Sequence, residues 1–349
     1  MSVFRPQTLT SIDNLFTQAT LDWHLDTEKT GLDWYITKQG VFHLLRKGRI
    51  AEAKGRMLDL NFMAEFAASH ETVVEPWKAW RVIGIEQARS GFMQLAESLN
   101  SRPVETHIVN TLSNFLQDVG LYQSGTVFAE WLLERTENDL GDEHSDTLTS
   151  VNNLALLYRN QGRYADAERL LLRALEGRER TLGPDHPYTL MSVSNLAVLY
   201  RSQGRYVEAE PLYARSLEGR ERVLGREHPD TLMSMAGLAV LYQSQGRYAE
   251  AEPLYLTAIE TQEHTRDKED IYTPISVGNL ASLYRSQGRY AEAEPLCLRV
   301  LEGQKRTLGP DHPDTLTSMN NLGQLYFYQG YYDEAEKLYV RALEGQERT

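Results

Sequence analysis

The sequence predicts an all-α solenoid, a fold in which short helical hairpins stack in a row. Three observations lead to this prediction: a tetrapeptide, Gln-Gly-Arg-Tyr, recurs at one interval, apolar residues between its copies follow a helical period, and Gly/Pro-rich loops separate the helices. The glycines of the tetrapeptide and of its variant fifth copy stand 42 residues apart, at Gly162, Gly204, Gly246, Gly288 and Gly330. A period in the range of about 20–50 residues is typical of repeat proteins that recognise other chains along the stack.

The repeat that begins at Val151 shows how each unit is built. Its first apolar residues have the i, i+3, i+4, i+7 spacing of one helix face, and they are Val151, Leu154, Ala155 and Tyr158. Gly162 follows where a helix end favours positive φ. A second apolar stripe begins at Ala167, and the loop that contains Pro184 ends it. Each unit is therefore expected to be helix A, a tight turn, helix B and a return loop.

The pattern Asn-Leu-Ala-x-Leu-Tyr-x-x-Gln-Gly-Arg-Tyr-x-x-Ala-Glu-x-Leu, which begins at Asn153, resembles the tetratricopeptide repeat. With Leu-Gly-Pro-Asp-His-Pro-x-Thr-Leu in its return loop, the unit is similar to the 42-residue repeats of kinesin light chains, nephrocystin-like proteins and repeat-tailed NTPases. The resemblance covers residues 145–349. It implies a right-handed α-α superhelical solenoid of tetratricopeptide repeats in which helices A line the inner face.

Two domains are expected. Residues 105–349 form the solenoid, with one degenerate repeat around Gly120 and five clear repeats. Residues 1–104 do not keep the period and hold four of the five tryptophans, which predicts an N-terminal helical domain that caps the solenoid. This part is similar to the helical linkers of NTPase–repeat proteins, but the sequence contains no G-x-x-x-x-G-K-[ST] phosphate loop.

Composition narrows the classes of function. A net charge of −13 argues against nucleic acid as a partner. One cysteine, Cys297, and the lack of an apolar run of about 18 residues predict a cytoplasmic protein without a membrane span. No catalytic or metal-binding motif stands out, so we expect neither an enzyme nor a cofactor. The recurrent histidines of the return loops are expected to hydrogen-bond at helix starts.

Polar residues of helix A recur from repeat to repeat and form the predicted binding site. Amides can pair with the backbone of an extended peptide, and arginine presents a planar fork that suits carboxylates. The expected peptide-binding groove consists of Asn152, Asn153, Arg159, Asn195, Arg201, Gln243, Asn279, Arg285, Asn320 and Asn321. Ala236 and Gly237 interrupt the row and indicate either a gap for a bulky partner side chain or drift. In the alternative interpretation, the amides bond to neighbouring helices and the arginines are solvated or pair with glutamates.

The leading hypothesis is a non-enzymatic protein–protein interaction scaffold whose concave groove binds a partner peptide that is acidic or ends in a free carboxylate. The alternative is a sensor or oligomerisation arm of an NTPase-type signalling or defence assembly. Leu338, Tyr339 and Leu343 at the last helix B also predict a homodimer through the C-terminal repeat.

Overall fold

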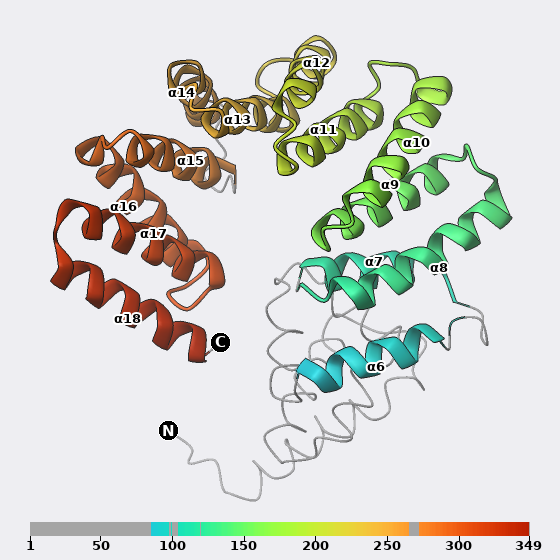
Figure 1. The fold of residues 1–349 in the computed structure, drawn as a ribbon, viewed down its shortest axis with the longest axis horizontal. Coiled ribbons are helices and arrows are strands. Elements are labelled where there is room, and N and C mark those ends of the chain that lie inside the picture. The colour runs from blue at the N-terminus through green and yellow to red at the C-terminus, as the bar shows by residue number, and fades with distance from the viewer. Residues whose placement is uncertain (1–84, 98, 100–103, 119, 265–271, 349) are drawn as a thin grey trace, which may run out of the picture. The chain divides into compact units, whose positions relative to one another are not determined.

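The computed structural model describes residues 85–97, 99, 104–118, 120–264 and 272–348 (Figure 1). Within these ranges the chain forms thirteen α-helices, α6 to α18, and no β-strand. The predicted all-α fold class is therefore confirmed. Most of the predicted N-terminal domain, residues 1–104, lies outside the described residues, and its capping role stays a prediction.

The chain divides into two compact units, and the boundary between Ala174 and Leu175 falls within one helix. The first unit contains α6 (Ile85–Glu97), α7 (Thr106–Asp118), α8 (Tyr122–Leu140), α9 (Ser145–Asn160) and the start of α10 (Tyr164–Leu182). The second unit contains α11 (Pro187–Ser202), α12 (Tyr206–Leu224), α13 (Pro229–Ser244), α14 (Tyr248–His264), α15 (Tyr272–Ser286), α16 (Tyr290–Thr307), α17 (Pro313–Gln329) and α18 (Tyr332–Arg348).

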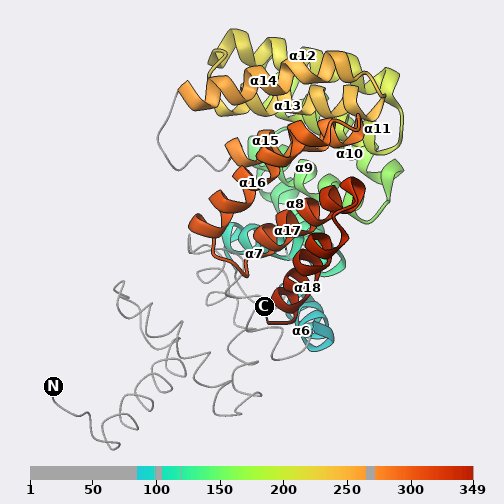
Figure 2. The ribbon, with the colours of Figure 1, turned by 90° about the vertical axis from the view of Figure 1, so that its left-hand side faces the viewer.

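Helices that are consecutive in the chain pack against each other within each unit. In the first unit, α8 contacts α6, α7 and α9. In the second, each helix from α11 to α18 contacts the next, so that α13 contacts both α12 and α14 (Figures 1 and 2). Ala197, Ala209, Ala239 and Ala251 are fully buried, which lets the helix backbones approach closely. This packing is the helical hairpin stack that the repeat predicts.

The return loop explains the Leu-Gly-x-x-His-Pro-x-Thr signature. Gly225 ends α12 with a φ of 89°, which favours glycine. His228 then caps α13, because its Nδ1 accepts a hydrogen bond of 3.1 Å from the backbone N–H of Asp230. Pro229 opens the helix, and Thr231 donates from Oγ1 to the Gly225 carbonyl at 2.8 Å. The glycine, histidine, proline and threonine of the signature therefore each have a structural role.

The other histidines of this signature, His144, His186 and His312, cap their helices in the same way. The expected role at helix starts is confirmed. Across the part of the chain that the structure describes, no group of His, Cys, Asp and Glu side chains has an arrangement that could hold a metal ion.

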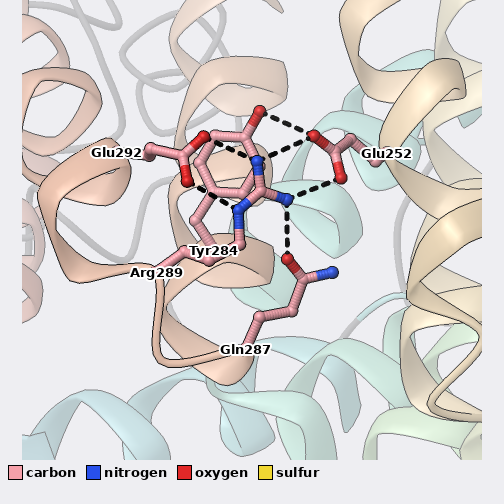
Figure 3. Close-up of polar contacts among 5 residues, drawn as sticks. All are labelled: Glu252, Tyr284, Gln287, Arg289 and Glu292. Atoms are coloured by element: carbon pink, nitrogen blue, oxygen red, sulfur yellow. Dashed lines mark hydrogen bonds and ion pairs between the residues drawn. The ribbon is translucent and has the colours of Figure 1, made fainter.

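The turn between helix A and helix B carries the Gln-Gly-Arg-Tyr signature and an interaction that we call the arginine clasp (Figure 3). The guanidinium of Arg289 lies over the ring of Tyr284, with Cζ 4.0 Å from the ring centre. Its nitrogens donate to Glu292 at 2.6 and 2.7 Å and to the Gln287 side-chain oxygen at 2.8 Å. They also donate to Glu252 of the preceding hairpin at 2.7 and 3.1 Å. One side chain thus joins two repeats.

The clasp recurs 42 residues earlier. Arg247 lies 4.1 Å from the ring centre of Tyr242 and donates to Glu250, Gln245 and, in the preceding hairpin, Glu210, all at 2.7 Å. Only arginine can do this, because its planar fork stacks on a ring and still offers five N–H donors. The side chains of Arg289 and Glu252 are 32% and 25% exposed, so solvent weakens the ion pair between them. We therefore expect the clasp to act through the combined geometry of its contacts rather than through a single ion pair.

Glycine inside helix B serves close packing between helices. At Gly219 in α12, an added Cβ would lie 2.6 Å from a methyl carbon of Leu190, which is fully buried in α11. Gly303 holds the same place two repeats later, and no described side chain lies within 4 Å of the corresponding position. The two glycines therefore differ in what they allow.

Gly219→Ala should destabilise the protein by about 1–3 kcal/mol, because the buried Leu190 side chain must leave its packed position. Gly303→Ala is the matched control and should stabilise by about 0.5–1 kcal/mol, because alanine restricts the unfolded chain and favours the helix. Thermal unfolding followed by circular dichroism measures both. Equal shifts of the two variants in the same direction would contradict the packing argument.

The clasp also predicts a dependence of stability on pH. Hydrogen bonds from Arg289 hold the pKa of Glu252 below its ordinary value of 4.5. Because this pKa is lower in the folded state than in the unfolded one, the stabilisation is complete above pH 4.5 and is lost as the pH falls through the folded-state pKa.

Glu252→Gln should therefore lower the unfolding temperature at pH 7 and flatten its decline below pH 4.5. Glu302→Gln is the control, because Glu302 is exposed on α16 and makes no ion pair within the described residues. Unfolding temperatures measured from pH 3 to pH 7 test this. A Glu252→Gln profile parallel to that of the wild type would show that the clasp carboxylate does not act as described.

Candidate binding surface on helices A

In the first unit, amides of neighbouring helices A contact each other. Asn153 of α9 donates from Nδ2 to Oδ1 of Asn110 in α7 at 3.3 Å. Asn152 is only 2% exposed, and its Nδ2 lies 3.5 Å from Oδ1 of Asn153. Asn152 therefore offers a bound chain almost no surface, and its side chain contacts Asn153. Its place in the predicted groove stays a prediction.

Arg159 stands at the end of α9 and is half-buried. Its Nε and Nη2 donate to the Asn160 side-chain oxygen at 3.3 and 3.0 Å. The acceptor is the side-chain amide of the next residue, so these two hydrogen bonds hold the guanidinium at the end of α9.

In the second unit, polar side chains connect each helix A to the next. Arg285 of α15 donates from Nη1 to Oε1 of Gln324 in α17 at 2.6 Å. Gln243 of α13 lies with Nε2 3.5 Å from Oγ of Ser282 in α15. In both pairs, a residue of the predicted groove contacts a polar residue 39 positions later on the next helix A, which the prediction did not include.

The arginines of these rows differ in charge pairing from most others in the unit. Within the described residues, neither Arg201 nor Arg285 forms an ion pair with a carboxylate, and the Nε of Arg201 is buried without a hydrogen-bond partner. The arginines that do pair with Asp or Glu are Arg205, Arg215, Arg222, Arg226, Arg247, Arg289, Arg299 and Arg341. The helix A surface thus has positive charge that no carboxylate among the described residues compensates.

The remaining predicted amides lie at or near the surface. Asn195, Asn279 and Asn320 are half-buried, and Asn321 is exposed. Within the described residues, no hydrogen bond joins the side chains of Asn279, Asn320 or Asn321 to another group. The donors and acceptors of these three side chains are therefore available to a bound chain.

The interrupted row of the third clear repeat is filled from within. An added Cβ at Gly237 would lie 2.8 Å from a ring carbon of Tyr213 in α12, so the gap admits the protein's own aromatic ring rather than a partner. Tyr255, one repeat later, donates from its hydroxyl to Oε1 of Gln243 at 3.1 Å. Burial raises the pKa of this Tyr255 phenol. In the sequence, Tyr213 and Tyr255 stand where the first clear repeat has Leu171, and this difference could have predicted that the gap is filled.

An apolar row was missed by the sequence analysis. Met191, Met233 and Ile275 each stand four residues before the Asn195 position of their repeat, which places them on the same helix face. Met233 and Ile275 are 47% and 57% exposed, whereas Met191 is half-buried. The helix A surface therefore combines apolar side chains with amides and guanidinium groups.

Other features of the described residues do not compete with this surface. Burial raises the pKa of the Cys297 thiol, which disfavours the nucleophilic thiolate. None of the described helices is apolar over a length sufficient to cross a bilayer. A shallow depression on α18 draws all its lining from that one helix, namely Asp333, Glu336, Lys337, Val340, Arg341 and Glu344.

The comparison with protein families is decisive for the class of fold. Residues 105–178, 146–220, 191–264 and 272–348 match the tetratricopeptide repeat, and these segments cover more than half of the chain. The chain belongs to the tetratricopeptide repeat family. Proteins built from this repeat are interaction scaffolds. No curated protein matches the chain.

Solved structures give the same family and fold. A protein described as a kinesin light chain of Podospora anserina, with nearly identical tetratricopeptide-like repeats, is 31% identical; the match covers 59% of this chain and 98% of that one, with a TM-score of 0.50. The apo form of RapI is 15% identical, with 82% and 98% covered and a TM-score of 0.53. A Rap protein complexed with Competence and Sporulation Factor is 11% identical, with 91% and 99% covered and a TM-score of 0.50. The prediction of a kinesin-light-chain-like repeat protein is confirmed, and the two Rap proteins share the fold.

Proposed function

We propose that this protein binds an extended, acidic peptide segment of a partner protein on the helix A surface of the second unit. The observation that supports this most is the charge of Arg201 and Arg285, which no carboxylate of the described chain neutralises. A half-buried guanidinium gains strong, charge-assisted hydrogen bonds when a carboxylate arrives. The chain carries a net charge of −13, so this local preference for an acidic ligand is unusual on its surface.

The amides supply the second element of recognition. Asn195 and Asn279 occupy the same position in repeats 84 residues apart, and Asn321 follows one repeat later. An asparagine side chain offers two donors and an acceptor, which match the N–H and C=O groups of an extended backbone. Such contacts set the register of a peptide without demanding a particular side chain.

The exposed Met233 and Ile275 supply the third element. Apolar side chains on the partner would lose contact with water against them, and this burial contributes about 25 cal/mol for each Å² removed from solvent. Methionine also adapts its shape to different ligands. We therefore expect a ligand that alternates acidic and apolar residues.

A relative by fold is consistent with ligand binding. The Rap protein was solved in complex with Competence and Sporulation Factor, and its repeats share the fold of this chain. The identity of 11% transfers no binding residue, so the proposal depends on the side chains described above.

Two further predictions stay open. A sensor or oligomerisation arm of an NTPase-type assembly would be favoured by an NTPase, protease or nuclease reading frame next to the gene. Homodimerisation through the C-terminal repeat is predicted from Leu338, Tyr339 and Leu343 of α18. Tyr339 and Leu343 are 38% and 57% exposed, whereas Leu338 is half-buried and packs against the core.

The combined change of Asn195, Asn279 and Arg201 to alanine should weaken peptide binding at least about tenfold, because each lost polar contact contributes roughly 1 kcal/mol. Peptides selected from a displayed library on the wild-type protein serve as ligands, and fluorescence anisotropy gives the affinities. Far-UV circular dichroism checks that helicity is kept.

Glu218→Ala is the matched control, because Glu218 is exposed on helix B of the same unit and should leave binding unchanged. Replacing the acidic residues of a selected peptide by their amides should reduce its affinity as much as the loss of Arg201 does. Selected peptides that bind the triple variant as tightly as the wild type would refute the helix A surface as the site.

A further inference from the structure

The last repeat lacks the arginine of the clasp. Tyr331 stands where the preceding repeats have Arg163, Arg205, Arg247 and Arg289. A tyrosine carries a single O–H donor in place of the five N–H donors of a guanidinium. The substitution removes the one cation of the clasp from the turn between α17 and α18.

The residues that surround the arginine elsewhere are all kept. Moving 42 residues along the chain from the clasp of Arg289, its four partners are again tyrosine, glutamine and two glutamates, namely Tyr326, Gln329, Glu294 and Glu334. We call these four residues the C-terminal guanidinium site. Within the described residues, neither of its glutamates forms an ion pair.

The polar atoms of this site are arranged for a donor that is missing. Glu294 accepts hydrogen bonds from the Tyr326 hydroxyl at 3.3 Å and from Nε2 of Gln329 at 3.2 Å. The other side-chain atom of Gln329, Oε1, is buried without a hydrogen-bond partner. The same oxygen of Gln287 accepts from the clasp arginine at 2.8 Å. A buried acceptor without a donor lowers stability. The acceptor here is the oxygen whose counterpart in the preceding repeat bonds to the guanidinium.

The carboxylates of Glu294 and Glu334, which form no ion pair within the described residues, also favour a cation at this site. Burial and the nearby charges of Glu294 and Glu334 raise the pKa of the Tyr326 phenol. In the other repeats an arginine offsets such charges, as Arg289 does beside Tyr284. The site therefore combines two carboxylates with an aromatic ring, which suits a planar cation.

Tyr331 does not take the place of the arginine. Its ring meets the Tyr326 ring edge-on with centres 6.1 Å apart, whereas the clasp guanidinium carbons lie 3.8 to 4.1 Å from their tyrosine rings. The Tyr331 side chain is 55% exposed and is not part of the core.

We propose that the C-terminal guanidinium site binds an arginine side chain presented by a peptide segment of a partner protein. The guanidinium would lie on Tyr326, donate to Glu294 and Glu334, and satisfy Oε1 of Gln329. Lysine fits less well, because its ammonium group is compact. It cannot stack flat on the tyrosine ring and also make the parallel hydrogen bonds that the other three groups require.

Exposed aromatic rings beside the site indicate what flanks the arginine. Phe327 packs edge-on against Tyr328 and Tyr332, with centres 6.0 and 5.4 Å apart, and all three are more than half exposed. Such a patch on a protein surface marks an interaction site. The partner segment should therefore carry apolar residues next to its arginine.

The ligand test uses fluorescein-labelled pentapeptides with arginine at the centre and mixed Leu, Phe and Ser at the other positions. The control peptides carry citrulline, which has the shape of arginine without its charge. In fluorescence anisotropy, the arginine peptides should bind the wild-type chain at least tenfold more tightly than the citrulline peptides. Glu294→Gln should reduce binding of the arginine peptides at least tenfold.

Tyr331→Arg is the discriminating variant. It supplies the missing guanidinium from the chain itself, so it should raise the unfolding temperature and abolish binding of the arginine peptides. Tyr331→Phe, the control, should keep binding. Asn279→Ala should also keep it, since this site is independent of the helix A proposal and either can fail alone. Equal binding of arginine and citrulline peptides, no binding of either, or a Tyr331→Arg variant that is no more stable than the wild type would each overturn the proposal.

Discussion

In two consecutive repeats of this solenoid, a guanidinium group joins the hairpin to its predecessor. Arg289 stacks on the last tyrosine of its own helix A and divides its donors between its own helix B and Glu252 of the hairpin before. Apolar packing brings helices together but does not specify rotation about the stack, because it is non-directional. The clasp specifies it, since a planar fork accepts partners only in fixed directions. We therefore expect the clasp to contribute to the regular stacking of helices A.

Regular stacking in turn sorts the positive charges into two groups. Arg247 and Arg289 at the turns form ion pairs within the clasp. Arg201 and Arg285 on helix A form no ion pair with a carboxylate among the described residues. The reverse holds at the last repeat, where Glu294 keeps its position but forms no ion pair with any described residue. The proposed acidic ligand on helix A and the proposed arginine ligand at the C-terminal turn are therefore both argued from one repeating contact.

Much of the fold could be predicted from the sequence, and what could not be predicted has physical causes. The 42-residue period and the His-Pro and Gly-Arg signatures predicted the hairpins, because caps and turns involve neighbours in the chain. Glu252 as the partner of Arg289 lies 37 residues away, and periodicity does not show which carboxylate a repeat shares with the next. The burial of Asn152 and the filling of the gap at Gly237 by Tyr213 depend on side-chain packing between helices, which a pattern of residue types does not resolve. Gln329 is the clearest case, because its unsatisfied oxygen becomes visible only in comparison with the intact clasps.

A double-mutant cycle on the clasp tests the central claim most directly. Arg247 and Glu210 belong to different hairpins and lie 2.7 Å apart. Unfolding temperatures of Arg247→Ala, Glu210→Ala and the double variant should show coupling, so that the double variant is less destabilised than the sum of the two single variants. If the two effects are additive, the arginine does not hold adjacent hairpins together, and the account of the stack is wrong.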